Sequence, residues 1–273
     1  MNALHEAKIR AASAYNAAAD HFDHPANTFW DRFGRATVDR LDLQTGSVVL
    51  DVCSGSGASA IPAAERVGPN GYVIGVDLAE NLLQLADGKA KRLGLGNVEF
   101  RTGDMLSLGF ADGHFDAVIC VFGIFFVPDM SAAVRELWRM LRPGGKMAIT
   151  TWGPNFFEPA NSAFWRAIRK EAPELHKSFN PWDRISEPSG LRAMFQEAGI
   201  EDCEISAQAG THPISSPEAW WMTLMGSGYR GTLDQLDATA LVRVKELNLK
   251  FIRDSGLRAV EANVLYAVAI KPE

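Results

Sequence analysis

The feature that most constrains the fold of this chain is a regular alternation of strand-like and helix-like segments, which begins at residue 47. Short apolar, β-branched runs such as SVVLDV (47–52) and FDAVICVFG (115–123) alternate with amphipathic runs such as ENLLQLADGKAKR (80–92). A strand that is apolar on both sides is typical of a parallel sheet covered by helices on both faces. Regular alternation also favours right-handed crossover connections. We therefore predict an α/β fold with a Rossmann-like, doubly wound sheet.

The remaining segments extend this pattern to the end of the chain. The run RPGG (142–145) is predicted to end a helix at 130–141. Further strands are predicted at 71–77, 97–104, 146–152, 200–214 and 262–272, and further helices at 58–68, 157–175, 187–199 and, with interruptions, 216–256. We expect an N-terminal helical arm (1–40) and a main domain (41–273) that carries a helical lid insertion at about 216–258.

Charge, apolar runs and cysteines argue against several functional classes. The net charge of −6 provides no long-range attraction to nucleic acid, and no run of about 18 apolar residues predicts a membrane span. The three cysteines lie far apart, which is typical of a reducing compartment rather than of a zinc site or a disulfide framework. We therefore expect a cytoplasmic protein that acts on a small molecule, with no bound metal and no nucleic-acid partner.

The stretch VLDVCSGSGASA (49–60) contains a glycine turn that two classes of cofactor could use. Gly55, Gly57 and Ala60 have the G-x-G-x-x-A spacing of dinucleotide-binding folds. Asp51, at the end of the preceding strand, would repel a pyrophosphate. It would attract the ammonium and sulfonium groups of S-adenosylmethionine, directly or by organising the loop amides. The absence of a Cβ at both glycines lets a ligand approach the backbone closely.

Two further carboxylates follow at the ends of the next two predicted strands. Asp77 can accept hydrogen bonds from both ribose hydroxyls, a contact that either cofactor would make. Asp104 can accept a hydrogen bond from an adenine amino group, and Met105 can pack against the base. Ligands of open α/β sheets bind outside the carboxyl ends of the strands, so we expect Asp51, Asp77 and Asp104 to line one crevice.

Five ordered segments between residues 45 and 152 resemble the motifs of class I S-adenosylmethionine-dependent methyltransferases: VLDVCSGSG, VIGVDLAENLL, RTGDM, FDAVICVFGIFFVPD and LRPGGKMAIT. The branch resembled is that of the ubiquinone- and menaquinone-biosynthesis C-methyltransferases and their small-molecule relatives. The resemblance implies a seven-stranded mixed sheet with an antiparallel last strand, capped by the N-terminal arm and by an insertion between strands six and seven. It also implies a cofactor site made of Asp51, Ser54, Gly55, Gly57, Asp77, Leu78, Asp104, Met105 and Val121.

Aromatic side chains gather in four parts of the chain that the inferred fold brings to the mouth of the crevice. They lie in the arm, after the fourth and fifth predicted strands, and in the insertion. We predict that they form a hydrophobic chamber for the molecule that receives the methyl group. The residues expected to line this chamber are Phe33, Phe122, Phe125, Phe126, Trp152, Trp221 and Met225.

These observations predict an enzyme that transfers a methyl group from S-adenosylmethionine to a carbon or oxygen atom of a small, fairly apolar acceptor. The reaction is an in-line displacement that leaves S-adenosylhomocysteine, and it requires alignment and exclusion of water rather than a metal. Candidate general bases are Tyr15, His212 and Tyr229. Two alternatives remain open at this point: an NAD(P)-dependent oxidoreductase, and an S-adenosylmethionine-binding module without catalytic activity.

Overall fold

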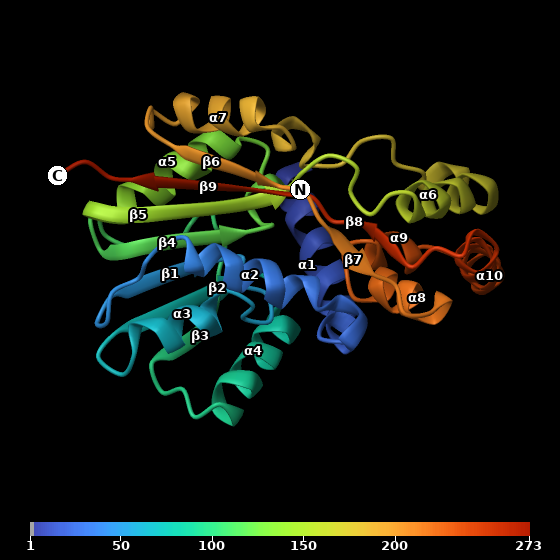
Figure 1. Cartoon of the computed structure of the whole chain (residues 1–273), viewed down its shortest axis with the longest axis horizontal. Coiled ribbons are helices and arrows are strands. Elements are labelled where there is room, and N and C mark those ends of the chain that lie inside the picture. The colour runs from blue at the N-terminus through green and yellow to red at the C-terminus, as the bar shows by residue number, and fades with distance from the viewer. Residues whose placement is uncertain (1–2) are drawn as a thin grey trace.

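The computed structural model describes residues 3–273, so the first two residues of the expected 1–40 arm lie outside the described range. Seven strands form one mixed sheet in the order β3-β2-β1-β4-β5-β9-β6 (Figure 1). In that order they span Val98–Thr102, Tyr72–Asp77, Val48–Val52, Phe115–Val121, Leu141–Trp152, Val264–Ile270 and Glu204–Gln208. Strand β9 pairs antiparallel with both β5 and β6, and the remaining neighbours are parallel. The predicted seven-stranded sheet with an antiparallel last strand is confirmed.

Helices cover both faces of the sheet. Helices α5 (Met130–Met140) and α7 (Pro188–Glu197) contribute to the core on one face, and α2 (Phe29–Asp39) and α3 (Ala60–Val67) to the core on the other; in Figure 1, α7 lies near the β6 edge of the sheet and α4 (Glu80–Arg92) near the β3 edge. Successive residues of β1 face opposite sides, because side chains alternate along a strand. Leu50 and Val52 therefore enter the large core that contains the apolar side of α5, whereas Val49 packs with residues of α2 and α3.

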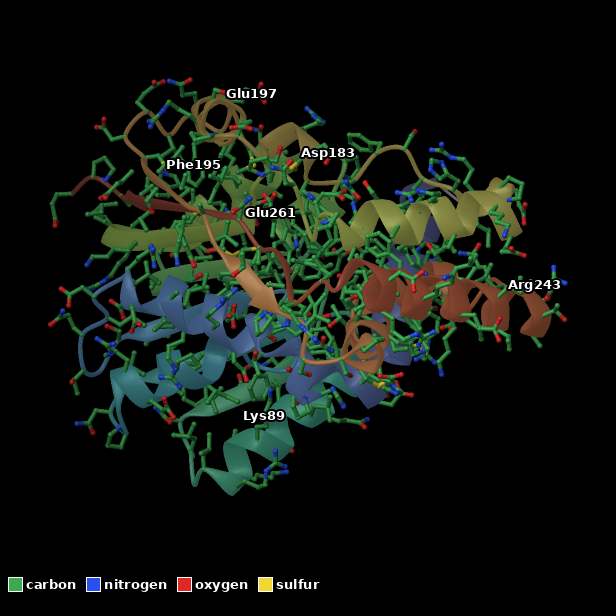
Figure 2. All side chains as sticks on the ribbon, turned by 45° about the vertical axis from the view of Figure 1, so that its right-hand side comes forward. Lys89, Asp183, Phe195, Glu197, Arg243 and Glu261 are labelled. Atoms are coloured by element: carbon green, nitrogen blue, oxygen red, sulfur yellow. The ribbon has the colours of Figure 1, made fainter. Side chains whose placement is uncertain are left out.

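A second group of helices lies beyond the carboxyl ends of the parallel strands, on the right of Figure 1. Helix α1 (Ala3–Phe22) crosses the strand ends, and α6 (Ala160–Glu171), α8 (Pro217–Met225), α9 (Arg230–Leu233) and α10 (Ala238–Ser255) lie outside it. An ion pair between Arg243 of α10, labelled in Figure 2, and Glu171 joins α10 to α6. Single-turn 3₁₀ helices lie at Pro25–Asn27, Ile124–Phe126, Pro173–Leu175 and Asp183–Ile185.

Local sequence signals explain where several helices begin and end. Asp129, Ser216 and Asp237 are the N-cap residues of α5, α8 and α10, and each accepts a hydrogen bond from the backbone N–H three residues later. Gly256, in the left-handed conformation, ends α10. No helix within residues 3–273 combines the length and the apolar character needed to cross a bilayer.

Two boundaries differ from the prediction. Strand β5 begins at Leu141 rather than after the RPGG run, because that run forms a bulge: Phe115 of β4 pairs with Leu141 and Ala117 with Lys146. The segment predicted as one strand at 200–214 forms two strands in different sheets. Strand β6 belongs to the large sheet, and β7 (Thr211–Pro213) pairs with β8 (Ala259–Glu261), a short strand that the sequence pattern did not indicate.

Candidate functional site

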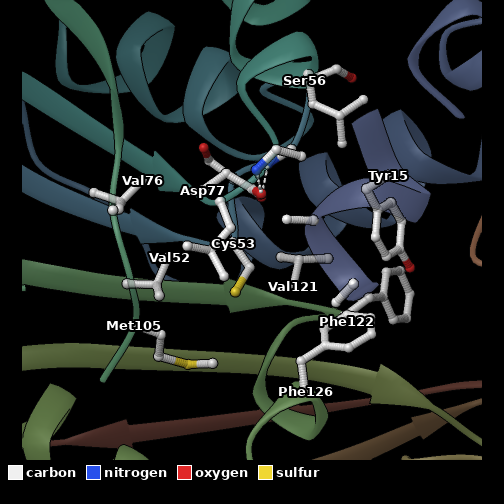
Figure 3. A pocket seen from close by; sticks show the side chains of 18 of the residues that line it. Tyr15, Val52, Cys53, Ser56, Val76, Asp77, Met105, Val121, Phe122 and Phe126 are labelled. Atoms are coloured by element: carbon white, nitrogen blue, oxygen red, sulfur yellow. Dashed lines mark hydrogen bonds between the residues drawn. The ribbon is translucent and has the colours of Figure 1, made fainter. Parts of the chain in front are cut away.

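A cavity that is partly open to solvent lies at the carboxyl ends of β1, β2, β3 and β4, under helix α1, with an open volume of about 1020 Å³. Figure 3 shows its walls: the glycine turn on one side, the ends of neighbouring strands beneath, and Tyr15 of α1 on the other side. Of the nine residues predicted to bind a cofactor, seven line this cavity. They are Ser54, Gly55, Asp77, Leu78, Asp104, Met105 and Val121.

The turn after β1 is held in a tight, left-handed course. Cys53, Gly55 and Gly57 have φ values of 59°, 52° and 87°, in the region that favours glycine. The N–H of Ser54 donates to the carbonyl of Val76 at 3.0 Å, so the turn is tied to the end of β2. A Cβ added at Gly55 would come no closer than 3.8 Å to another atom, which leaves that backbone open to a ligand.

Asp77, the last residue of β2, is the carboxylate at the centre of the cavity. Its Oδ2 accepts the N–H of Gly55 and its Oδ1 accepts the N–H of Ala79, both at 2.9 Å (Figure 3 draws hydrogen bonds at this carboxylate). Burial raises the pKa of Asp77, and the backbone hydrogen bonds partly oppose that rise. Each carboxylate oxygen has a second lone pair, so both can still accept a hydrogen bond from a ligand hydroxyl.

Asp104 follows β3 and is already engaged by the protein. Its Oδ2 accepts a hydrogen bond from the ammonium of Lys8 on α1, and its Oδ1 accepts the N–H of Leu106 at 2.9 Å. Met105 is buried beside it in the cavity wall. The helix that covers the cavity is therefore attached to the residue that was predicted to read the adenine base.

Asp51 does not line the cavity, so the expectation that three carboxylates face one crevice is corrected to two. The residue lies on the same side of β1 as Val49, towards α3, and its side chain is fully buried. Its Oδ2 accepts the hydroxyl hydrogen of Ser59 at 2.7 Å, just before the first turn of α3. Burial raises the pKa of Asp51 to about 7. Gly57 also lies outside the cavity, because it packs against Ile61.

A second cavity of about 770 Å³ adjoins the first and is walled mainly by aromatic rings. Phe122, just after β4, has a φ of 54° and stacks on Trp152 with ring centroids 4.0 Å apart. Four residues line both cavities and form the boundary between them: Tyr15, Trp30, Phe122 and Phe126. We call the second cavity the aromatic chamber.

The structure brings together only part of the predicted chamber. Phe122, Phe125, Phe126 and Trp152 line it, whereas Phe33, Trp221 and Met225 do not. Phe33 is buried behind the wall, in edge contact with Phe122 and Trp152. Trp221 is buried in α8 with the ammonium of Lys245 on α10 over its ring, 5.7 Å from the centroid. Spacing on α8 does not tell which face of the helix points to the chamber, and this caused the misplacement.

Several chamber residues were missed by reasoning from the sequence. Phe156 and Phe157 come shortly after β5, and their position beyond a strand end was a usable signal. Trp30, by contrast, belongs to the aromatic residues of the arm that were expected at the mouth of the crevice, and it lines the chamber. Trp165 and Trp182 reach the chamber through long-range packing of the segment after β5, for which no local signal exists.

The three candidate bases occupy different places. Tyr15 lies at the boundary of the two cavities, and Tyr229 lines the chamber while donating to Asn161 Oδ1 at 2.7 Å. Burial raises the pKa of both phenols, because it disfavours the charged phenolate. His212 lines neither cavity: its Nε2 lies 2.7 Å from the carbonyl of Ala26, and burial lowers its pKa.

Comparisons with known proteins agree on one family. Residues 49–145 match the model of a methyltransferase domain. The chain is 34% identical over 193 residues to the demethylmenaquinone methyltransferase of Listeria welshimeri, covering 66% of this chain and 80% of that protein. It is 36% identical over 177 residues to the enzyme of the same name from Geobacillus kaustophilus, covering 61% and 76%.

Solved structures show the same fold. A methyltransferase from Aquifex aeolicus that depends on S-adenosylmethionine superimposes with a TM-score of 0.53 and 21% identity, covering 70% of this chain and 89% of that one. The matches to methyltransferases give no support to the oxidoreductase alternative. The chain belongs to the class I S-adenosylmethionine-dependent methyltransferases, in the branch of the demethylmenaquinone methyltransferases, and it is an enzyme that uses S-adenosylmethionine as methyl donor.

Proposed function

We propose that the cavity under α1 binds S-adenosylmethionine and that the aromatic chamber binds a small, flat, apolar methyl acceptor. The observation that carries this proposal is that the two cavities meet at one wall. Tyr15, Trp30, Phe122 and Phe126 belong to both, so ligands of the two cavities would touch there. Alignment of donor and acceptor across a water-poor boundary is the main requirement of methyl transfer.

The residues of the first cavity fit a nucleoside that carries positive charge and no phosphate. Asp77 and Asp104 supply two carboxylates, and Lys8, the cation among the lining residues, is paired with Asp104. We assign the ribose hydroxyls to Asp77, and the adenine base to Asp104, Leu78 and Met105. The methionine end is assigned to Ser54, Gly55 and the backbone of Val121.

Asp51 and Gly57 have an indirect role in this assignment. Asp51 lies beneath the glycine turn and bonds to Ser59 at the start of α3, where a carboxylate is favoured by the helix dipole. Gly57 lets the turn before α3 approach α4, since a Cβ there would lie 3.3 Å from the Cβ of Ala86. Both residues therefore shape the turn that Gly55 presents to the ligand.

The acceptor is proposed to be an aromatic hydroquinone-like molecule. The relatives in the same branch are named demethylmenaquinone methyltransferases, and this chain has a chamber whose walls are aromatic. Planar rings pack favourably against aromatic side chains such as Trp152 and Phe156, which both line the chamber and contact each other with centroids 4.6 Å apart. Hydroxyl groups on the ring would find the phenols of Tyr15 and Tyr229 on the chamber wall.

The protein's own residues position the donor and the acceptor and do not remove a proton. Bound S-adenosylmethionine would supply an activated methyl group: the new bond to the acceptor atom forms as the methyl–sulfur bond breaks, S-adenosylhomocysteine is left, and the acceptor's proton passes to bulk water. Tyr15 stays protonated at neutral pH because burial raises its pKa, so it can donate a hydrogen bond at the boundary but cannot serve as a phenolate base. The rings of Trp30 and Phe122 exclude water from the boundary between the two cavities.

We also propose that residues 1–40 and the insertion at about 216–258 act together as the cap of the site. Helix α1 provides Lys8 and Tyr15 to the walls, and the insertion provides Tyr229. The Arg230 side chain on α9 reaches Asp20 at the end of α1, which links the two parts of the cap. The three cysteines are free thiols, which supports a cytoplasmic location.

Calorimetry and a transfer assay test the proposal. S-Adenosylmethionine and S-adenosylhomocysteine are titrated into the full-length protein, with NAD as the control ligand. Label transfer from methyl-labelled donor to 1,4-naphthohydroquinone and 2-naphthol is then followed by mass spectrometry. We expect both sulfur ligands to bind, NAD to give no heat, and label to appear on the ring or its oxygen. Binding of both sulfur ligands without transfer to any apolar phenol or hydroquinone would overturn the acceptor assignment.

A further inference from the structure

A third depression adjoins the aromatic chamber and differs from it in charge. It lies between α6 and the segment 176–180, with an open volume of about 890 Å³. Trp165, Lys177, Phe179 and Asn180 line both the chamber and this depression, so one continuous molecule could occupy the two. We call it the basic groove.

The groove carries positive charge only. Arg166, Arg169 and Lys177 line it together with His176, and no Asp or Glu is among the described residues that line it. This is notable in a chain whose net charge is −6. A groove of one sign in a protein of the other sign attracts ligands of opposite charge.

Of the acids nearest to these cations in the chain, Glu174 is exposed and does not line the groove, and two others are engaged elsewhere. Glu171, on the same helix, pairs with Lys170 and Arg243. Glu158 accepts hydrogen bonds from the side chains of Asn161 and Ser162. The cations of the groove are therefore not neutralised by the carboxylates of α6 or of the turn before it.

Two arginines of α6 contribute to the lining of the groove. Arg169 donates to His176 Nε2 at 2.8 Å, which requires that nitrogen to be unprotonated and leaves the other guanidinium N–H groups free to donate. Arg166 lies three residues earlier on the exposed side of α6, one turn away from Arg169. Burial lowers the pKa of Lys177, and the positive charge of Arg10, which pairs with Glu6, adds to this.

We propose that the basic groove binds an anionic group, a carboxylate or a phosphate, that is attached to the methyl acceptor while its ring lies in the aromatic chamber. This inference rests on the proposed function and narrows it to acceptors that are apolar at the reacting ring and negatively charged at one end. Arginine fits carboxylate and phosphate through paired N–H groups, so Arg166 and Arg169 would select for this end.

Matched probes separate the groove from the chamber. The full-length protein, saturated with S-adenosylhomocysteine, is titrated with 2-naphthol and with 6-hydroxy-2-naphthoate, which share a ring system and differ by one carboxylate. Quenching of tryptophan fluorescence reports binding, because Trp30, Trp152, Trp165 and Trp182 line the chamber. We expect the naphthoate to bind about tenfold more tightly than the naphthol, which is about 1.4 kcal/mol.

Variants test the named residues. Arg166→Gln/Arg169→Gln should weaken the naphthoate about tenfold and leave the naphthol unchanged, and Arg166→Lys/Arg169→Lys should recover part of the difference. Arg35→Gln/Arg66→Gln is the control, since it removes two charges that pair with Glu65 and Asp39 on α3 and α2. These arginines are exposed, so the folded state should be preserved in all three proteins.

The outcomes distinguish the inference from the proposed function. The groove proposal is wrong if the naphthol binds and the naphthoate binds no more tightly. It is also wrong if the tighter binding of the naphthoate persists when both arginines are replaced. In either case the chamber assignment is unaffected. If neither probe binds while S-adenosylhomocysteine does, the chamber assignment falls and the groove proposal with it. Sodium phosphate should compete with the naphthoate and not with the naphthol. Phosphate that binds without displacing the naphthoate would mean a site for a free anion, which also overturns the proposal.

Discussion

The ammonium of Lys8 donates a hydrogen bond to Asp104 Oδ2, which joins helix α1 to the carboxyl end of β3. Both side chains are only partly exposed, at 20% and 30%. The contact therefore lies within the wall of the cavity under α1 rather than on the open surface. Lys8 and Asp104 both line this cavity, so a ligand bound under α1 would lie beside the pair.

Replacing Lys8 with Met should speed ligand exchange. A partly exposed ion pair contributes up to about 1 kcal/mol, so its loss should raise the dissociation rate of S-adenosylhomocysteine about fivefold. Stopped-flow fluorescence measures that rate. Lys91→Met is the matched control, because Lys91 pairs with Asp87 within α4 and touches neither cavity. An unchanged dissociation rate in Lys8→Met would show that α1 is not held by this contact.

Asp77→Ala should weaken the binding of S-adenosylmethionine. The lost hydrogen bonds to a charged group are worth about 1.5–3 kcal/mol, which corresponds to a loss of about 10- to 150-fold. Calorimetry measures the dissociation constant, and Asp87→Ala, an exposed acid on α4, serves as control. Asp77→Asn keeps one acceptor oxygen, so its dissociation constant should lie between those of Asp77→Ala and the unaltered protein. A dissociation constant in Asp77→Ala equal to that of the unaltered protein would refute the ribose assignment.

The sequence allowed the sheet to be predicted because each parallel strand ends in a local signal. Asp51, Asp77 and Asp104 mark the ends of β1, β2 and β3, and glycines follow or precede them. The direction of Asp51 was inferred wrongly, although the two-residue period of β1 contained the answer. With Leu50 and Val52 facing one side, Asp51 must face the other.

The aromatic chamber could be predicted only in part, for a different reason. Phe122 and Trp152 follow strand ends, so the sheet itself fixes their place. Trp182 lies far along the chain, and it reaches the chamber through contacts with Phe125 and Phe156. Such contacts depend on how the segment after β5 folds back over the sheet, which no local pattern encodes.

The two glycines of the turn should respond differently to substitution by Ala. At Gly57 the new Cβ would lie 3.0 Å from the side chain of Ile61, so the free energy of unfolding should fall by about 1–3 kcal/mol. At Gly55 the new Cβ meets no close atom, so the cost to folding is limited to the left-handed φ of 52°, but the Cβ would sit where the ligand approaches. Gly55→Ala should therefore weaken S-adenosylhomocysteine about tenfold, about 1.4 kcal/mol, and Gly57→Ala should change it less than twofold. Denaturant titration and calorimetry measure the two effects, and the reverse pattern would contradict the assignment of the turn.

The stability of the protein should depend on pH through Asp51. Burial raises its pKa to about 7, whereas the unfolded chain has the ordinary value of about 3.9. Between these values the folded protein holds a proton that the unfolded chain releases. The free energy of unfolding should therefore fall as pH rises from about 4 to about 7, by up to about 1.4 kcal/mol per pH unit, and level off above.

Asp51→Asn isolates this contribution. Asp77 also has a raised pKa and adds a slope of the same sign, so the difference between the unaltered protein and Asp51→Asn is the quantity to measure. Denaturant titrations at pH 5, 6, 7 and 8 measure this difference in the free energy of unfolding. We expect the difference to change steadily up to about pH 7 and then remain constant. A difference that is independent of pH over the whole range would mean that Asp51 is ionised in the folded protein.

Trp182 and Trp221 test which part of the cap contacts the acceptor. Trp182→Ala removes a half-buried ring from the chamber wall, so the KM for the acceptor should rise about tenfold while the dissociation constant of S-adenosylmethionine stays the same. Trp221→Ala should lower the free energy of unfolding by about 3–5 kcal/mol, because the ring is buried in the helical insertion, and it should leave the acceptor KM unaltered in the folded fraction. Trp138→Ala, a half-buried ring on α5 that lines neither cavity, is the control for the loss of a tryptophan. A rise in acceptor KM for Trp221→Ala without one for Trp182→Ala would place the acceptor against α8 rather than in the aromatic chamber.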